Sequence, residues 1–275
     1  MSAVLASQDR PQARWAGSRD ALHSEWTKLR TITGPGLALI AAIALTAALG
    51  AIAANAAGCQ ARGCQIDPAK VSLTGIYLGQ AIVAIVAVTV VGGEYSTGMI
   101  RLTLTAVPRR WQVLAAKAGV VSAATFTAGV VAVLGSLLAG RLLLYGHGFT
   151  PAHGYEPLSL GTAAVLRAAA GSVLYLVLIA LLGLGIATAI RDTATSIGVA
   201  LGLLYLFPII TSFVADPHWQ RHMDQIGPMT AGLYIQATTN LRSLPMTPWQ
   251  GLGVLAAWAA GALLAGGVML SLRDA

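Results

Sequence analysis

The sequence predicts an all-α integral membrane protein with six transmembrane helices, and two observations carry this prediction. Hydrophobic side chains make up 56% of the 275 residues and charged ones only 10%, whereas soluble domains hold about 25% charged residues. Six apolar stretches are also each long enough to cross a bilayer as a helix. They cover residues 34–56, 72–92, 112–145, 163–190, 196–215 and 249–270.

Little of the chain is left for a separate domain. Residues 1–17 are predicted to be a disordered cytoplasmic tail, and residues 18–275 a single six-span transmembrane domain. The first apolar run starts too late and is too long for the core of a signal peptide, so we expect it to stay as the first span.

The residues just before the first span have the pattern of a surface helix. Leu22, Trp26 and Leu29 recur at i, i+4 and i+7, while polar residues such as Glu25 point elsewhere. This spacing predicts an amphipathic interfacial helix, with Trp26 at headgroup depth. The simplest interpretation is that this helix only anchors the N-terminus.

The basic residues predict the orientation. An even number of spans places both termini on one side, and lysine and arginine accumulate on the cytoplasmic side. With the N-terminus inside, 11 of the 17 basic residues lie in or beside inner segments. The outer segments and span ends hold Arg62, Lys70, Arg141, Arg167, Arg221 and Arg242. We therefore expect an N-in, C-in topology.

The second half of the chain has two further features. The fourth and fifth spans are separated only by 191–195, which predicts a hairpin with a tight charged turn. Pro208 is expected to kink the fifth span. Between the fifth and last spans, 216–248 contains four prolines and predicts short helices that cap the outer mouth.

The segment after the second span is polar and basic where its surroundings are apolar. Glu94 stands where the apolar run stops, Gly98 follows four residues later, and Pro108-Arg109-Arg110 precedes the next run. We interpret this segment as a short cytoplasmic helix, capped by Glu94 or Ser96 and ended by Pro108, that inserts into a partner. Arginines that only follow the positive-inside rule and bind anionic lipid would leave Glu94, Gly98 and Pro108 without a role.

This arrangement resembles the cytoplasmic coupling segment of ATP-binding cassette (ABC) transporter permeases of the type-2 (ABC-2) class, which mostly export. In that class an acid, a Thr-Gly pair, a Pro-basic pair and a later lysine recur between spans two and three. Glu94, Thr97-Gly98, Pro108-Arg109-Arg110 and Lys117 match them in order. The ending Leu272-Arg273-Asp274 resembles that of actinobacterial members.

The resemblance implies a multi-pass permease of the bacterial cytoplasmic (plasma) membrane that moves an amphipathic or hydrophobic substrate by alternating access. An ABC ATPase subunit would bind ATP and Mg, and this chain would bind no cofactor and catalyse nothing. A second permease protomer, identical or paralogous, would complete the pathway. The helix around Trp26 would be an elbow helix beside the ATPase contact. The implied coupling residues are Glu94, Thr97, Gly98, Met99, Arg101, Leu104, Pro108, Arg109, Arg110 and Lys117.

The sequence also indicates that energy for transport comes from outside this chain. The apolar cores of the spans hold no Asp, Glu, Lys, Arg or His, since Lys117, Arg141 and Arg167 lie at span ends from which they can snorkel. The chain also lacks a P-loop motif, so energy for transport must come from a partner. The alternatives are a membrane scaffold or sensor subunit without transport, and an ion-coupled secondary exporter.

The remaining candidates concern the pathway, the cysteines and metal ions. In the ABC-2 class spans two and five face the partner protomer around the substrate route, which makes Tyr205, Phe207 and Thr211 pathway candidates. Cys59 and Cys64 stand in the first outer loop, where a disulfide is one option; zinc would need two further ligands, and none is near in sequence.

Neither a metal site nor a nucleic-acid site is predicted from the histidines and the net charge. His218 and His222 are four residues apart, but Trp219 replaces the glutamate of a His-Glu-x-x-His hydrolase. We interpret them as one face of a surface helix and expect no metal. The net charge of +7 is spread between apolar runs, which argues against nucleic acid.

Overall fold

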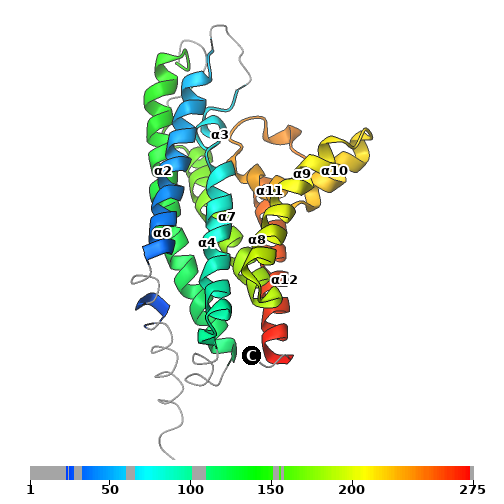
Figure 1. Ribbon diagram of the computed structural model, residues 1–275. Helices are drawn as coiled ribbons and strands as arrows, with labels where there is room; N and C mark the ends of the chain where they lie inside the picture. The colour runs from blue at the N-terminus through cyan, green and yellow to red at the C-terminus, as the bar shows by residue number, and fades with distance from the viewer. Residues whose placement is uncertain are drawn as a thin grey trace, which may run out of the picture.

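The computed structural model is a bundle of long helices (Figure 1). It describes residues 23, 25–27, 33–59, 66–100, 110–150, 155 and 158–272, and within these ranges no strand occurs. Six helices are long and apolar enough to cross a membrane. They are α2 (Thr33–Ala56), α4 (Ile76–Ser96), α6 (Arg110–Gly146), α7 (Ala163–Ile190), the consecutive helices within Thr193–Ser212, and α12 (Pro248–Leu272). The prediction of an all-helical protein with six helices long and apolar enough to span a membrane is confirmed for the described residues.

The helix bounds differ from the predicted spans where polar residues continue a helix. The second span runs to Ser96 instead of residue 92. The third has 37 residues and is therefore about 55 Å long, well beyond a hydrocarbon core of about 30 Å. The turn before the fifth span is shorter than predicted, because the Asp192 carboxylate accepts a hydrogen bond from the Thr195 N–H at 2.8 Å and caps the helix that begins at Thr193.

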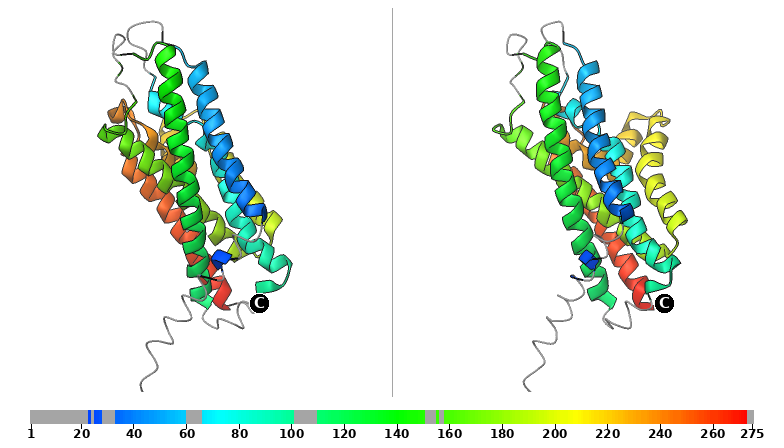
Figure 2. Two further views of the ribbon diagram at one scale, coloured as in Figure 1. Left: turned by 90° about the vertical axis from the view of Figure 1, so that its left-hand side faces the viewer. Right: turned by 60° about the vertical axis from the view of Figure 1, so that its left-hand side comes forward.

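α7 lies at the centre of the bundle. It packs against α4, α6 and α12, while α2 lies against α4 and α6 on one flank (Figures 1 and 2). Tyr175, Ile179 and Leu182 of α7 are almost completely buried. At the crossing with α12 the backbones approach closely, since a Cβ at Gly185 would lie 2.5 Å from the carbonyl carbon of Ala262. A small residue is required there.

The fifth span is irregular. It consists of α8 (Thr193–Leu201), a π-helical turn η2 (Gly202–Leu206) and α9 (Phe207–Ser212). Pro208 has no N–H, and its ring collides with the carbonyl one turn earlier in a regular helix. The widened turn lies directly before this proline, so the irregularity predicted at Pro208 takes the form of a π turn.

Short helices occupy the segment between α9 and α12. They are α10 (Pro217–Ile226), α11 (Pro228–Gly232), η3 (Leu233–Gln236) and η4 (Leu241–Ser243). Figure 1 shows α9 and α10 projecting from the side of the bundle. Another short helix, α3 (Pro68–Ser72), begins at Asp67, whose carboxylate accepts hydrogen bonds from the N–H groups of Ala69 and Lys70.

The carboxylate of Asp67 also joins α3 to this later segment. It accepts hydrogen bonds from the N–H and hydroxyl groups of Thr238 and from the N–H group of Thr239. Asp67 therefore connects two parts of the chain that are far apart in sequence.

The start of α2 and the end of α12 lie at the same end of the bundle, together with the end of α4 and the start of α6 (Figure 1). We call this the coupling end. An even number of spans requires such an arrangement. That it faces the cytoplasm stays a prediction, and the predicted tail 1–17, Leu22 and Leu29 lie outside the described residues.

Candidate functional site

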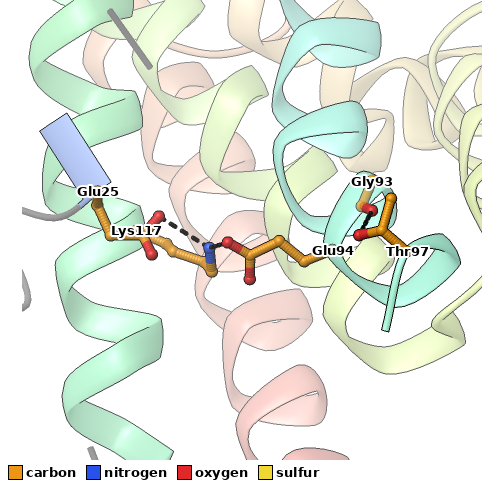
Figure 3. A network of polar contacts seen from close by, with 5 residues as sticks. All are labelled: Glu25, Gly93, Glu94, Thr97 and Lys117. Carbon is orange, nitrogen blue, oxygen red and sulfur yellow. Dashed lines mark hydrogen bonds and ion pairs between the residues drawn. The ribbon is translucent and has the colours of Figure 1, made fainter. Parts of the chain in front are cut away.

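Three charged side chains meet inside the protein at the coupling end. Nζ of Lys117, on α6, lies 2.7 Å from Oε1 of Glu94 and 2.8 Å from Oε2 of Glu25. Figure 3 shows the ammonium group between the two carboxylates. Lys117 is 3% exposed, and Glu25 and Glu94 are 5% and 7% exposed. We refer to Glu25, Lys117 and Glu94 as the ionic triad.

Each member of the triad comes from a different segment. Glu25 belongs to the N-terminal segment before α2, Glu94 to the last turn of α4, and Lys117 to α6 about two turns after its start. A buried charge is stable only when it is paired. The triad therefore holds these three segments in one fixed arrangement.

The end of α4 explains the position of Glu94. The Thr97 hydroxyl donates to the carbonyl of Gly93 at 2.8 Å (Figure 3), and Gly98 has a left-handed φ of 72° that ends the helix. The prediction that Glu94 or Ser96 caps the start of a short helix is wrong. Both residues are within α4, because their polarity does not end a helix whereas a left-handed glycine does.

Lys117 does not snorkel to water, contrary to expectation. α6 continues for two turns towards Arg110, and the N-terminal segment brings Glu25 over the lysine. Its ammonium group is therefore satisfied inside the protein. Glu94 and Lys117 are almost fully buried and bind one another, and their part in coupling stays a prediction.

Two arginines bind the end of α12 beside the triad. Nη1 of Arg110 donates to the carbonyl of Leu270 at 2.6 Å, and Nη2 of Arg191 donates to the carbonyl of Met269 at 2.8 Å. Carbonyls in the last turn of a helix lack partners within the helix and carry its negative dipole end. These contacts fasten α12 to the start of α6 and to the turn after α7.

The turn that carries Arg191 is itself well defined. Arg191 has a left-handed φ of 65°, and its guanidinium carbon lies 5.6 Å from the centroid of the Tyr95 ring. Hydrogen bonds from the hydroxyl and N–H groups of Thr195 lower the pKa of the neighbouring Asp192 carboxyl. The acid is thus held as a charged cap on α8.

A cavity of about 510 Å³ lies next to the triad, between α2, α4 and α6. All three triad residues line it. The rest of its wall is mainly apolar and includes Ala38, Ile85, Val86, Val90, Val120 and Val121. The cavity therefore separates part of α2 from α4 and α6 at the depth of the triad.

The other predicted coupling residues divide into two groups. Thr97, Gly98 and Met99 are exposed at the coupling end, directly after the triad residue Glu94. Arg101, Leu104, Pro108 and Arg109 lie outside the described residues, and so does most of the predicted coupling helix. Arg110 contacts the end of α12, and its part in coupling stays a prediction.

Sequence reasoning did not assign Glu25 to the site. The only sign of Glu25 in the sequence is its place on the polar face of the predicted surface helix. Its partner Lys117 is 92 positions away, and no local pattern links the two residues. The neighbouring Trp26 is 49% exposed.

The pathway candidates lie elsewhere. The Tyr205 hydroxyl donates to the backbone carbonyl of Tyr77 on α4, and the buried Thr211 hydroxyl donates to the carbonyl of Pro208 at 2.8 Å. Phe207 packs beside Gly227. None of the three lines the 510 Å³ cavity. Their role in a pathway stays a prediction.

The cysteines and histidines are placed in part. Cys59 is disulfide-bonded and almost fully buried. Its expected partner Cys64 lies outside the described residues, so the pairing stays a prediction. His218 and His222 are both exposed on α10, with ring centroids 4.5 Å apart.

Comparisons with known proteins do not identify a relative. No model of a protein family matches the chain, and no curated protein matches it.

Proposed function

We propose that the protein is the transmembrane permease subunit of an ABC exporter, driven by a separate ATPase subunit. The observation that carries the proposal is the ionic triad. It joins the end of α4 and the start of α6, which flank the polar stretch 97–109, to the N-terminal segment that carries Glu25. A force applied to this stretch reaches all three segments together.

The contact between α4 and α6 supports a joint movement of these two helices. In the proposed cycle, ATP binding closes the partner ATPase and pushes on the stretch 97–109. Lys117 connects α6 to Glu94 on α4, so the two helices move as a unit. The cavity of about 510 Å³ between α2, α4 and α6 provides space for such a movement. The long α6 carries the displacement to the opposite end, and hydrolysis resets the helices.

The distribution of acids supports an external energy source. Glu94 is the only aspartate or glutamate within the six spans, and it lies at the bundle end in an ion pair with Lys117. Proton- or sodium-coupled transporters depend on ionisable groups near the middle of the membrane. This placement favours ATP over an ion gradient.

The proposal includes the remaining parts expected from the sequence. Two six-span protomers, identical or paralogous, would pair with two ATPase subunits in a bacterial plasma membrane. ATP and Mg would bind to the ATPase subunits. The substrate would be amphipathic or hydrophobic.

The test is co-purification with a matched control. The tagged protein is extracted from its native membrane in mild detergent, and associated proteins are identified by mass spectrometry. The test variant reverses two charges in the proposed coupling stretch, Arg101→Glu with Arg109→Glu. The control reverses two exposed charges away from that stretch, Arg221→Glu with Arg242→Glu. Wild type and control should retain a stoichiometric nucleotide-binding subunit that the test variant loses.

Other outcomes separate the alternatives. If no ATPase accompanies the intact protein in several detergents, the proposal fails. An ATPase that binds but shows no turnover linked to transport in proteoliposomes would identify a scaffold or sensor. Transport that survives ATP depletion and collapses with an uncoupler would identify an ion-coupled exporter.

A further inference from the structure

A second cavity, of about 390 Å³, lies at the end of the bundle opposite the triad. Its wall is formed mainly by apolar and aromatic side chains, among them Leu142, Tyr145, Phe149 and Leu158, and Arg141 also lines it. Arg141 is exposed, and no hydrogen bond or ion pair to it is present within the described part of the chain. The cavity thus combines an apolar interior with one available cation.

The acid nearest to this cavity in sequence does not balance that charge. Asp67 precedes Pro68, which lines the cavity, but its carboxylate accepts hydrogen bonds from five groups. These donors belong to α3 and to Thr238 and Thr239. A carboxylate that is satisfied in this way has little capacity left for a guanidinium.

The position of Arg141 along α6 gives its depth in the membrane. Lys117 and Arg141 are 24 residues apart on one helix, which corresponds to about 36 Å. No residue between them is charged. Since the hydrocarbon core is about 30 Å thick, Arg141 lies at headgroup level when Lys117 lies near the opposite surface. Tyr145, one turn further along, is 64% exposed, as is typical of aromatic residues at a membrane interface.

We propose that this cavity binds an anionic phospholipid of the adjacent leaflet. The planar guanidinium of Arg141 binds the headgroup phosphate, for which arginine has matching donor geometry, and an anionic lipid has no choline cation to offset this attraction. The apolar wall around Leu142 and Phe149 accepts the upper part of an acyl chain. The site depends neither on a partner ATPase nor on which side of the membrane this end faces.

The experiment measures lipid retention by native mass spectrometry. Purified protein is incubated with phosphatidylglycerol or phosphatidylcholine of identical acyl chains, and bound lipid is counted after release from detergent. Wild type should prefer phosphatidylglycerol. Arg141→Gln should reduce that preference about five-fold, the effect of one basic residue near an anionic surface. Arg242→Gln, which removes an exposed arginine outside the cavity, should leave it unchanged.

A second pair of variants separates the cavity from general charge attraction. Leu142→Trp keeps Arg141 but crowds the cavity, whereas Leu138→Trp places the same side chain one turn earlier, outside it. Both leucines are at least 60% exposed, so the fold should tolerate either change. Only Leu142→Trp should lose bound phosphatidylglycerol. The proposal is overturned if Arg141→Gln keeps the preference, if Arg242→Gln loses it equally, or if the two tryptophan variants behave alike.

Discussion

Replacing Lys117 by methionine should strongly destabilise the protein. Methionine matches the apolar stem of the lysine side chain but lacks the ammonium group that lies 2.7 and 2.8 Å from two carboxylate oxygens. Glu25 and Glu94 then remain buried without that cation. Removing one partner of a buried ion pair costs about 3–5 kcal/mol of unfolding free energy. Lys70→Met, which removes an exposed lysine, should change it by less than about 0.5 kcal/mol.

A compensating variant tests the cause of that loss. Glu25→Gln and Glu94→Gln, combined with Lys117→Met, remove all three charges while nearly keeping the volumes. A buried neutral amide costs much less free energy than a buried unpaired carboxylate. The triple variant should therefore recover at least half of the stability lost by Lys117→Met, which makes the three substitutions strongly non-additive.

The assay is reversible unfolding in mixed micelles with increasing dodecyl sulfate, followed by circular dichroism. The reasoning would be refuted if Lys117→Met lost less than about 1 kcal/mol. It would also be refuted if the triple variant were less stable than Lys117→Met, because the charges would then not be the source of the effect.

Further predictions use the same assay unless stated. Gly185→Ala should cost about 1–3 kcal/mol, because the new Cβ meets the backbone of Ala262, whereas Gly261→Ala has open space and should be neutral or slightly stabilising; equal effects would contradict the helix crossing. Tyr175→Phe should cost about 1–3 kcal/mol, because the buried Gln80 carbonyl loses its hydroxyl donor, and an unchanged stability would exclude that bond. Asp67→Ala should speed limited proteolysis near Thr238, and cleavage at the wild-type rate would show that the carboxylate does not hold this segment. The folded pKa of Asp192 is lowered, so its contribution to stability is present above its unfolded pKa and should be lost as pH falls through the folded one. Asp192→Asn should lack this part of the acid dependence, and an identical pH profile would contradict the prediction.

The spans could be predicted well because the bilayer sets their length. The first and fourth match the helices at α2 and α7, where apolar residues stop at the helix ends. Local composition does not predict the end of a helix that continues through polar residues, as α4 does to Ser96. The turn is set there by the left-handed backbone of Gly98. A glycine in the sequence does not by itself reveal that conformation.

The candidate site was only partly predictable for a different reason. Glu94 and Lys117 stand out as charged residues beside apolar runs, and a sequence pattern can find them. Their burial, and the contribution of Glu25, depend on how α2, α4 and α6 pack in three dimensions. The two cavities arise from that packing too, and they have no sequence signature of their own.

The π turn in the fifth span has a consequence for how that helix can vary. A turn of this type contains one residue more than a regular helical turn, so everything after it is rotated by about 100° relative to an uninterrupted helix. Deleting a single residue between Gly202 and Leu206 would remove the extra residue of the turn, and it would rotate the face that carries Thr211 away from its present neighbours. Chains of this architecture should therefore tolerate substitutions in the π turn far better than a change in its length.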